Sequence, residues 1–402
     1  MSLGKTVGTV ANLFVQKKYP VSLIHFVTNR CNARCSFCFI DFGHAETQKK
    51  SNEMTIDEIR LLTRTLGPSL QHVNLTGGEP FLRLDLIDIV RAYFDNADLG
   101  SILINTNGAF PKQVETLTKT VLEEYPGKKI FFIFSIDAFP EDHDRIRKVR
   151  GLFHKVIESY HIVKSLGPNA VPSINLTVSG ENYRVVNDLY DVLRRDYGVD
   201  NMSPVIVRDE GVYRIPTEQK AAILEAYRRL TEKLLSDVRT GAINGFDTGT
   251  IRGRMVNAKN QIQYRMIADV YMEPAYQSQC PAGSIFGVIG TDATVHACEI
   301  LSKPLGNLRD YGMDFLKLWH DAKATEVKDW IRDTQCHCHW ECAWTYNILS
   351  NVRYQPQLIK HALLAPRVKH DRSGTARHGG DTDHQEQPAP LDVHRGVPPP
   401  GA

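Results

Sequence analysis

The stretch VSLIHFVTNRCNARCSFC, residues 21–38, joins an apolar run to three closely spaced cysteines. Val21–Val27 is typical of a strand buried on both faces of a parallel sheet, because such strands are apolar almost without a break. Cys31, Cys35 and Cys38 follow it with the spacing C-x3-C-x2-C. Iron–sulfur cubes are normally held by four cysteines. A local group of three therefore predicts a cluster with one iron left for a ligand from outside the chain. A zinc site is the alternative, although zinc loops usually have C-x2-C pairs and an x3 gap fits them less well, and a disulfide framework is the third possibility.

Strand and helix patterns alternate from this run to about residue 210. The first helix pattern begins at a capping box, Thr55–Glu58, and other helix patterns follow the later strands. Such alternation predicts a parallel sheet with right-handed crossovers and active-site loops at the carboxyl ends of the strands. The six predicted strands are Val21–Val27, His72–Thr76, Ser101–Thr106, Lys129–Asp137, Ser173–Val178 and Met202–Val207.

Composition excludes several classes of protein. The net charge of +2 over 402 residues gives no single-sign field strong enough to indicate nucleic-acid binding. No apolar run is long enough to span a membrane, and we see no secretory signal, so we expect a cytoplasmic protein. In that compartment eight cysteines indicate metal or redox chemistry before disulfides.

The cysteine spacing, with the aromatic Phe37 directly before Cys38, resembles the radical S-adenosylmethionine (radical SAM) superfamily. The stretch Gly77-Gly78-Glu79-Pro80, after the second predicted strand, is similar to the G-G-E-P motif of that family. The resemblance implies that SAM chelates the open iron and that this motif binds the SAM amino group. The glycines would let the backbone approach a ligand closely, and Glu79 would offer a carboxylate.

Further SAM contacts are implied at the ends of later strands. Ser135 and Asp137 resemble residues that contact the ribose and methionine parts of SAM, and Asn175 is another candidate. Strand-end capping is the structural alternative for the first two. The segment His143–Gly151 also resembles the family, and there we expect helix packing more than catalysis. No catalytic residue is predicted.

The last five cysteines form a second group. The segment Asp292–Cys298 resembles the hairpin of SPASM and twitch domains, which carry auxiliary clusters, although Ala293 replaces the usual glycine. Five cysteines instead of the seven of a full SPASM domain imply a one-cluster, twitch-like version. The expected ligands are Cys280, Cys298, Cys338 and Cys342, with Cys336 as the alternate. A zinc knot built from the segment Cys336–Cys342 is the alternative.

The expected fold is thus α/β: a partial (β/α)6 TIM-like barrel with a smaller C-terminal α+β domain that binds a cluster. The predicted parts are an N-terminal lead-in (1–20), the radical SAM core (21–210), a helical linker region (211–279), the SPASM/twitch-like domain (280–365) and a disordered tail (366–402).

The implied function is that of a radical SAM oxidoreductase or maturase. A 4Fe–4S cluster with SAM would give a 5′-deoxyadenosyl radical, which abstracts hydrogen from a substrate, with help from one auxiliary 4Fe–4S cluster. Many SPASM enzymes that modify peptides carry an added peptide-recognition domain, and only some twenty residues precede the first strand here. We therefore expect a small-molecule substrate such as a sugar or cyclitol. A SPASM-type maturase of precursor peptides is the second hypothesis. A non-catalytic iron–sulfur or zinc-binding module is the third, and a flavodoxin- or ferredoxin-type reductant is the implied partner.

Overall fold

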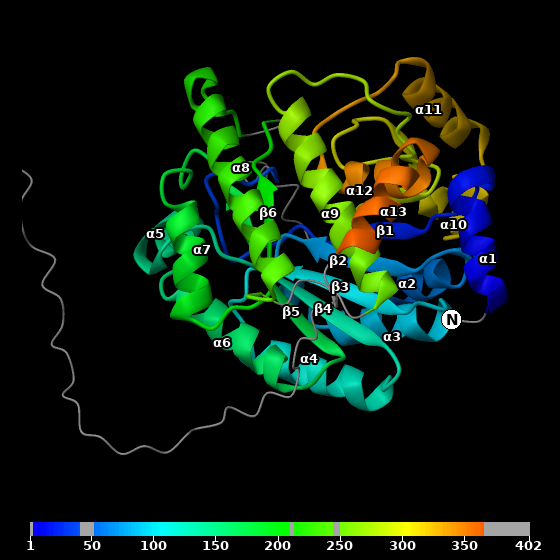
Figure 1. Ribbon diagram of the computed structural model, residues 1–402. Coiled ribbons are helices and arrows are strands. Elements are labelled where there is room, and N and C mark those ends of the chain that lie inside the picture. Colours follow the sequence, from blue (N-terminus) through cyan, green and yellow to red (C-terminus); the bar gives the residue numbers. More distant parts are fainter. Residues whose placement is uncertain (1–2, 41–51, 210–212, 244–249, 366–402) are drawn as a thin grey trace, which may run out of the picture. The chain divides into compact units, whose positions relative to one another are not determined.

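The computed structural model describes residues 3–40, 52–209, 213–243 and 250–365 of the chain. Its described strands form one sheet in the order β6-β5-β4-β3-β2-β1-β7-β8-β9. Figure 1 labels β1 to β6 of this sheet. Strands β1 to β7 pair in parallel, and β8 and β9 are antiparallel. The strands are β1 (Ser22–Thr28), β2 (His72–Gly77), β3 (Ser101–Thr106), β4 (Lys129–Ser135), β5 (Ala170–Val178), β6 (Met202–Ile206), β7 (Phe286–Ile289), β8 (Thr294–His296) and β9 (Pro304–Asn307).

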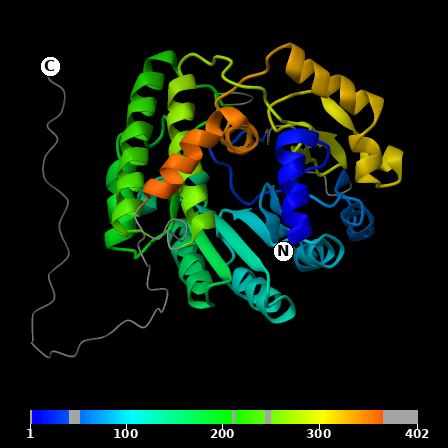
Figure 2. The same cartoon turned by 45° about the vertical axis from the view of Figure 1, so that its right-hand side comes forward.

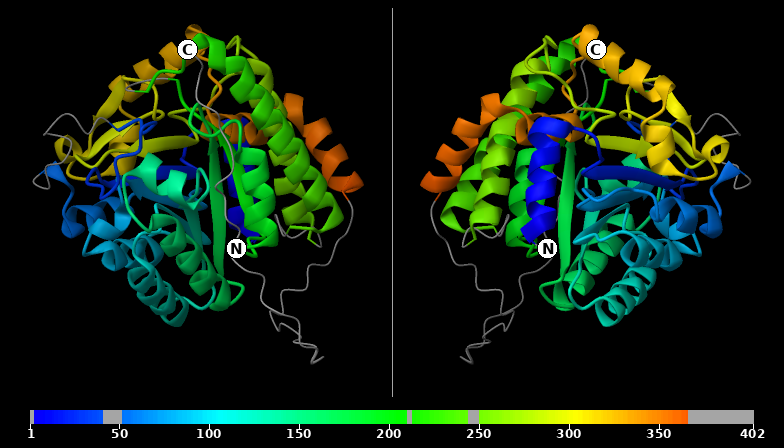
Figure 3. Two further views of the ribbon diagram at one scale, coloured as in Figure 1. Left: turned by 90° about the vertical axis from the view of Figure 1, so that its left-hand side faces the viewer. Right: turned by 90° about the vertical axis from the view of Figure 1, so that its right-hand side faces the viewer.

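Helices cover both faces of this sheet (Figure 3). On one side lie α2 (Ile56–Thr63), α3 (Leu86–Asn96), α4 (Pro111–Glu124) and α6 (Leu152–Ser165), and on the other lie α1 (Leu3–Ala11), α8 (Thr217–Thr240), α9 (Ile251–Val270) and α13 (Gln355–Leu364). The remaining described helices are α5 (Pro140–Arg147), α7 (Val186–Arg195), α10 (Phe315–Trp319), α11 (Ala322–Asp333) and α12 (Glu341–Ser350), with short turns η1 (Asn12–Gln16), η4 (Pro80–Leu82), η5 (Leu308–Tyr311) and η6 (Val352–Tyr354). A largely parallel sheet between helices confirms the predicted α/β class.

The first crossover helix, α2, begins as the sequence predicts. The backbone N–H of Glu58 donates to Thr55 Oγ1 at 3.2 Å, and the backbone N–H of Thr55 donates to Glu58 Oε2 at 2.8 Å. This reciprocal capping satisfies N–H groups that the first turn leaves without partners. The helix then buries Ile59 and Leu62 in the core.

Alternation along the strands separates a buried apolar face from a face that is only partly buried and is polar at the carboxyl ends of the strands. Phe132 and Phe134 of β4 are fully buried, and the Phe134 ring faces Gly108, where Val156 of α6 also approaches. Asn105 and Ser135 alternate with buried residues and therefore face the opposite side. Helix α12 packs on this second face of the sheet, where its Tyr346 hydroxyl lies 3.0 Å from Nε2 of His72 in β2. The polar face at the carboxyl ends of the strands is thus the inner surface of the partial barrel.

The C-terminal strands continue the barrel sheet. β7 pairs in parallel with β1, with Ser22 opposite Phe286, and the antiparallel β8 and β9 follow. Figure 2 places these yellow segments at the β1 edge, away from the green β6. The predicted domain boundaries remain a prediction, and the predicted tail, 366–402, lies outside the described residues. In the described parts of the chain, no helix is both long and apolar enough to cross a membrane.

Candidate functional site

The first cysteine group lies in the loop that leaves β1. Cys31, Cys35 and Cys38 are each partly buried, and their charges affect one another. Burial raises the pKa of Cys31 to about 12 and that of Cys38 to about 11, and it also raises the pKa of Cys35. Metal ligation needs thiolates, so metal binding there would release protons from these thiols. Burial keeps these three neighbouring thiols protonated and neutral. On binding one cluster, the three sulfur atoms would lose their protons and bind positively charged irons instead.

The glycine pair after β2 fits against the start of this loop. A Cβ atom on Gly77 would lie 2.0 Å from the Thr28 carbonyl oxygen, and one on Gly78 would lie 2.2 Å from the Arg30 carbonyl oxygen. The backbone N–H of Gly78 donates to Thr28 at 2.7 Å, and that of Glu79 donates to Arg30 at 2.8 Å. The close approach seen here is therefore to the chain's own backbone. The predicted contact of both glycines with SAM remains a prediction.

The carboxylate of Glu79 is fully buried and has three donors inside the protein. Oε1 accepts from Thr106 Oγ1 at 2.7 Å and from the Phe81 N–H at 3.1 Å, and Oε2 accepts from the Asn107 N–H at 2.7 Å. Burial raises the pKa of Glu79 to about 7, although these hydrogen bonds oppose the rise. Glu79 therefore ties the end of β2 to the end of β3. Its role toward the SAM amino group remains a prediction.

A buried ion pair lies close to the cysteine loop. Arg147 Nε donates to Asp137 Oδ2 at 2.6 Å, with both side chains almost completely buried. The Arg147 carbonyl accepts the N–H of Arg34 at 3.0 Å, and the guanidinium charge lowers the pKa of Cys35, against the larger effect of burial. The Asp137 N–H also donates to His143 Nδ1 at 3.2 Å. Sequence reasoning missed Arg147; the family-like segment His143–Gly151 was the signal that could have found it.

The other predicted SAM residues lie at the carboxyl ends of β4 and β5 and in the cysteine loop. Ser135 pairs with Asn175 across the two strands. Ser203 Oγ of β6 donates to Asn175 Oδ1 at 3.4 Å, so a row of polar side chains crosses the inner face. The Phe37 ring meets the Tyr213 ring edge-on, 6.4 Å between centres. Their contact with SAM stays a prediction.

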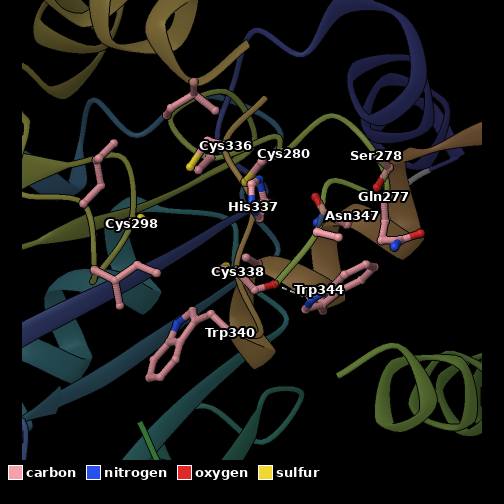
Figure 4. Close-up of a pocket in the computed structure, with 16 residues that line it drawn as sticks. Gln277, Ser278, Cys280, Cys298, Cys336, His337, Cys338, Trp340, Trp344 and Asn347 are labelled. Atoms are coloured by element: carbon pink, nitrogen blue, oxygen red, sulfur yellow. Dashed lines mark hydrogen bonds between the residues drawn. The ribbon is translucent and has the colours of Figure 1, made fainter. Parts of the chain in front are cut away.

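The second cysteine group surrounds a cavity of about 130 Å³ (Figure 4). Cys280, Cys298, Cys336 and Cys338 line it, and burial raises the pKa of all four thiols. Cys342 does not line this cavity. The structure thus brings together the three expected ligands Cys280, Cys298 and Cys338 with the alternate Cys336.

The surroundings of Cys342 differ from those of the other four thiols. Burial raises its pKa strongly, and its charged neighbours are Glu299, Arg208, Glu341 and Lys259. Among the described residues, no group of three or more His, Cys, Asp or Glu side chains is arranged to hold a metal ion. The auxiliary cluster and the zinc knot therefore both remain predictions.

The hairpin before the second group keeps its turn without the usual glycine. Ala293 has φ = +69°, a left-handed conformation that costs an L-residue about 1–2 kcal/mol. The Thr294 N–H donates to Asp292 Oδ1 at 3.1 Å, and the Ala293 N–H donates to the Gly290 carbonyl at 3.2 Å. These bonds hold the turn between β7 and β8.

Curated proteins match part of this chain. Curated relatives include the GTP 3′,8-cyclase of Pectobacterium atrosepticum, 34% identical over 103 residues, which are 25% of this chain and 31% of the relative. The GTP 3′,8-cyclase of Clostridium perfringens is 27% identical over 227 residues, 54% of this chain and 65% of the relative. The matches thus span less than two thirds of either relative's length.

Solved structures agree with the fold. "Native anSMEcpe with bound AdoMet" has a TM-score of 0.57 at 17% identity, over 86% of this chain and 97% of that one. SuiB of Streptococcus suis bound to S-adenosylmethionine has a TM-score of 0.52 at 16% identity, over 81% of this chain and 70% of that one. The family model that matches residues 26–193 is that of the Radical SAM superfamily. This range contains the first cysteine group, the glycine pair and the Asp137–Arg147 pair, and it forms a radical SAM domain.

Proposed function

We propose that this protein is a radical SAM enzyme whose first cluster is held by Cys31, Cys35 and Cys38. When bound and reduced, a 4Fe–4S cluster with SAM supplies a 5′-deoxyadenosyl radical that abstracts hydrogen from a substrate. The observation that carries the proposal is the loop of three partly buried, mutually interacting thiols, hydrogen-bonded to the end of β2 through Gly78 and Glu79.

The chain's own residues would position the reactants and exclude water. The glycine pair and Glu79 fix the backbone beside the cysteine loop, and the Asp137–Arg147 pair places a cation near the thiolates. We assign SAM to the carboxyl ends of β2 to β5, with Phe37, Ser135 and Asn175 as contacts. A reactive radical must meet one C–H bond before it meets water, so this fixed geometry is what catalysis requires.

For the second group we propose an auxiliary 4Fe–4S cluster on Cys280, Cys298, Cys336 and Cys338. This set differs from the sequence-based expectation by one residue, because Cys336 lines the cavity and Cys342 does not. Four thiols around one cavity match the usual ligand number of a cube. A zinc site at the same place is the competing assignment.

The names of similar proteins point to two classes of substrate. Two curated relatives are named GTP 3′,8-cyclase, and GTP is a small molecule, which agrees with the small-molecule hypothesis. A peptide substrate is the second candidate, because one similar solved structure is SuiB bound to precursor peptide SuiA. A flavodoxin- or ferredoxin-type reductant would supply the electron.

Anaerobic reconstitution with iron and sulfide, followed by SAM and dithionite, tests the proposal. We expect 5′-deoxyadenosine from the wild type and none above background from a Cys35→Ala control. If the wild type gives no more product than that control, a non-catalytic iron–sulfur or zinc-binding module becomes the better assignment.

Metal content tests the second site. Two cubes require about eight irons per chain. Cys336→Ala should lose about four of them, and Cys342→Ala is the matched control that should lose none. The reverse result would return Cys342 to the ligand set, and zinc in place of half of the iron would support the knot.

A further inference from the structure

Arg208, two residues beyond the end of β6, lies between the two groups of cysteines. Its guanidinium carbon is 4.1 Å from the centre of the Phe39 ring and 2.9 Å from the centre of the Trp340 ring. Phe39 directly follows Cys38, and Trp340 lines the C-terminal cavity. One cationic side chain therefore contacts an aromatic ring from each cysteine site.

Glu299 completes this arrangement. Its Oε2 accepts from Arg208 Nη2 at 3.1 Å and from Trp340 Nε1 at 2.9 Å, and its side chain is only 7% exposed. A buried carboxylate is costly unless it is paired and hydrogen-bonded. Glu299 directly follows Cys298, which lines the cavity, so the ion pair is held next to a cavity-lining residue along the chain.

The charge of Arg208 acts at both places. The guanidinium lies over Phe39, next to Cys38, and over Trp340, which lines the C-terminal cavity, so its positive charge lies near both places. The carboxylates that face the guanidinium are Glu299, which is bonded to it, and Glu341, whose pKa the same charge lowers against burial. Removal of Arg208 would therefore change the electrostatic environment of both cysteine groups.

We propose that Arg208 is a positioning residue that clamps the loop of Cys38 against the C-terminal cavity and sets the charge that clusters at both places experience. Arginine suits this task because its planar guanidinium stacks on aromatic rings while its N–H groups pair with a carboxylate. The redox effect rests on the proposed function, since it requires clusters at the cysteines. The clamp itself is a property of the chain and can be tested without metal.

Hydrogen–deuterium exchange of the metal-free protein tests the clamp. In Arg208→Gln we expect faster exchange in two segments, residues 31–40 and residues 336–342. Arg194→Gln is the matched control, since Arg194 pairs with Asp237 at 3.0 Å between α7 and α8 and should change neither segment. Faster exchange in one segment only, or in neither, would overturn the clamp.

Redox titration of the reconstituted protein tests the charge. A positive charge favours the reduced cluster, so Arg208→Gln should make the midpoint potential of the first cluster more negative, and Glu299→Gln should make it more positive. Arg208→Lys keeps the positive charge but loses the planar guanidinium. It should leave the midpoint potential of the first cluster near that of the wild type, while hydrogen–deuterium exchange in the two segments becomes faster. It also carries the test if Arg208→Gln does not fold. Equal potentials in all variants would overturn the electrostatic role.

None of these measurements needs SAM cleavage or a substrate. Failure to form 5′-deoxyadenosine would therefore count against the proposed function and would leave the test of Arg208 intact.

Discussion

Glu79 is the clearest case of a single residue whose surroundings determine its chemistry. Its pKa is raised to about 7 because it is fully buried, whereas the ordinary value is 4.5. The folded state therefore binds the proton more tightly than the unfolded state does. The contribution of Glu79 to the free energy of unfolding is therefore most favourable below about pH 4.5 and becomes less favourable as the pH rises toward 7.

A Glu79→Gln variant checks this pH dependence. We expect wild-type unfolding free energy to fall between pH 5 and pH 7.5 relative to the variant, by about 2–3 kcal/mol. The variant itself loses about 1–3 kcal/mol at low pH, because its amide group meets donors instead of acceptors. Urea unfolding at the two pH values measures both effects. Parallel pH curves would show that Glu79 does not titrate in this range.

Gly78 gives a steric prediction at the same scale. Gly78→Ala would bring a Cβ to 2.2 Å from the Arg30 carbonyl, so the backbone must shift. We expect a loss of more than about 2 kcal/mol in unfolding free energy, of the size typical for overpacking and strain. Gly127→Ala is the control, since a Cβ there meets nothing within 4 Å, and it should leave stability within about 1 kcal/mol. Equal effects of the two changes would show that the close approach is not rigid.

At the scale of single elements, α5 offers an internal comparison of a buried and an exposed ion pair. Arg147 pairs with Asp137 at side-chain exposures of 8% and 0%, whereas Arg145 pairs with Asp142 at 63% and 59%. Removing one partner of a buried pair leaves an uncompensated charge and costs about 3–5 kcal/mol. We expect that loss for Arg147→Gln and less than about 0.5 kcal/mol for Arg145→Gln. Thermal unfolding of both variants measures it, and similar small losses would contradict the structural role of the pair.

The strands of the barrel could be predicted from the sequence because a strand buried inside a parallel sheet is almost continuously apolar. Lys129–Asp137 was predicted as a strand, and β4 occupies Lys129–Ser135 of it. The partners of site residues could not be predicted in the same way. The pairing of Asp137 with Arg147 depends on how α5 packs after the strand. Likewise, cysteine spacing alone does not show that the thiol of Cys342, in the first turn of α12, lies away from the cavity.

At the scale of the whole molecule, the sheet is continuous from the barrel strands into the C-terminal strands, because β7 pairs directly with β1. The smaller C-terminal domain that the sequence predicts remains a prediction. Composition and periodicity gave no sign of the pairing of β7 with β1, because strand order depends on contacts between residues that are far apart in the sequence. The contact of Arg208 with Phe39 and Trp340 was hidden for the same reason.

Removal of the segment after residue 279 would leave β1 as an unpaired edge. An exposed apolar edge strand promotes association, so we expect this truncated protein to elute as large aggregates in size-exclusion chromatography. A variant that ends at residue 370 keeps β7 to β9 and should remain unaggregated. Monomers from the shorter variant, with an unchanged circular dichroism spectrum, would show that β7 is dispensable for the barrel.

The pairing of β1 with β7 also has a consequence for synthesis in the cell. Ser22 emerges from the ribosome long before its neighbour Phe286, and at roughly 5–20 residues per second the interval is some tens of seconds. During that time the strand that leads into the first three cysteines has one side open. Chaperones can reach this nascent segment before β7 pairs with its open side.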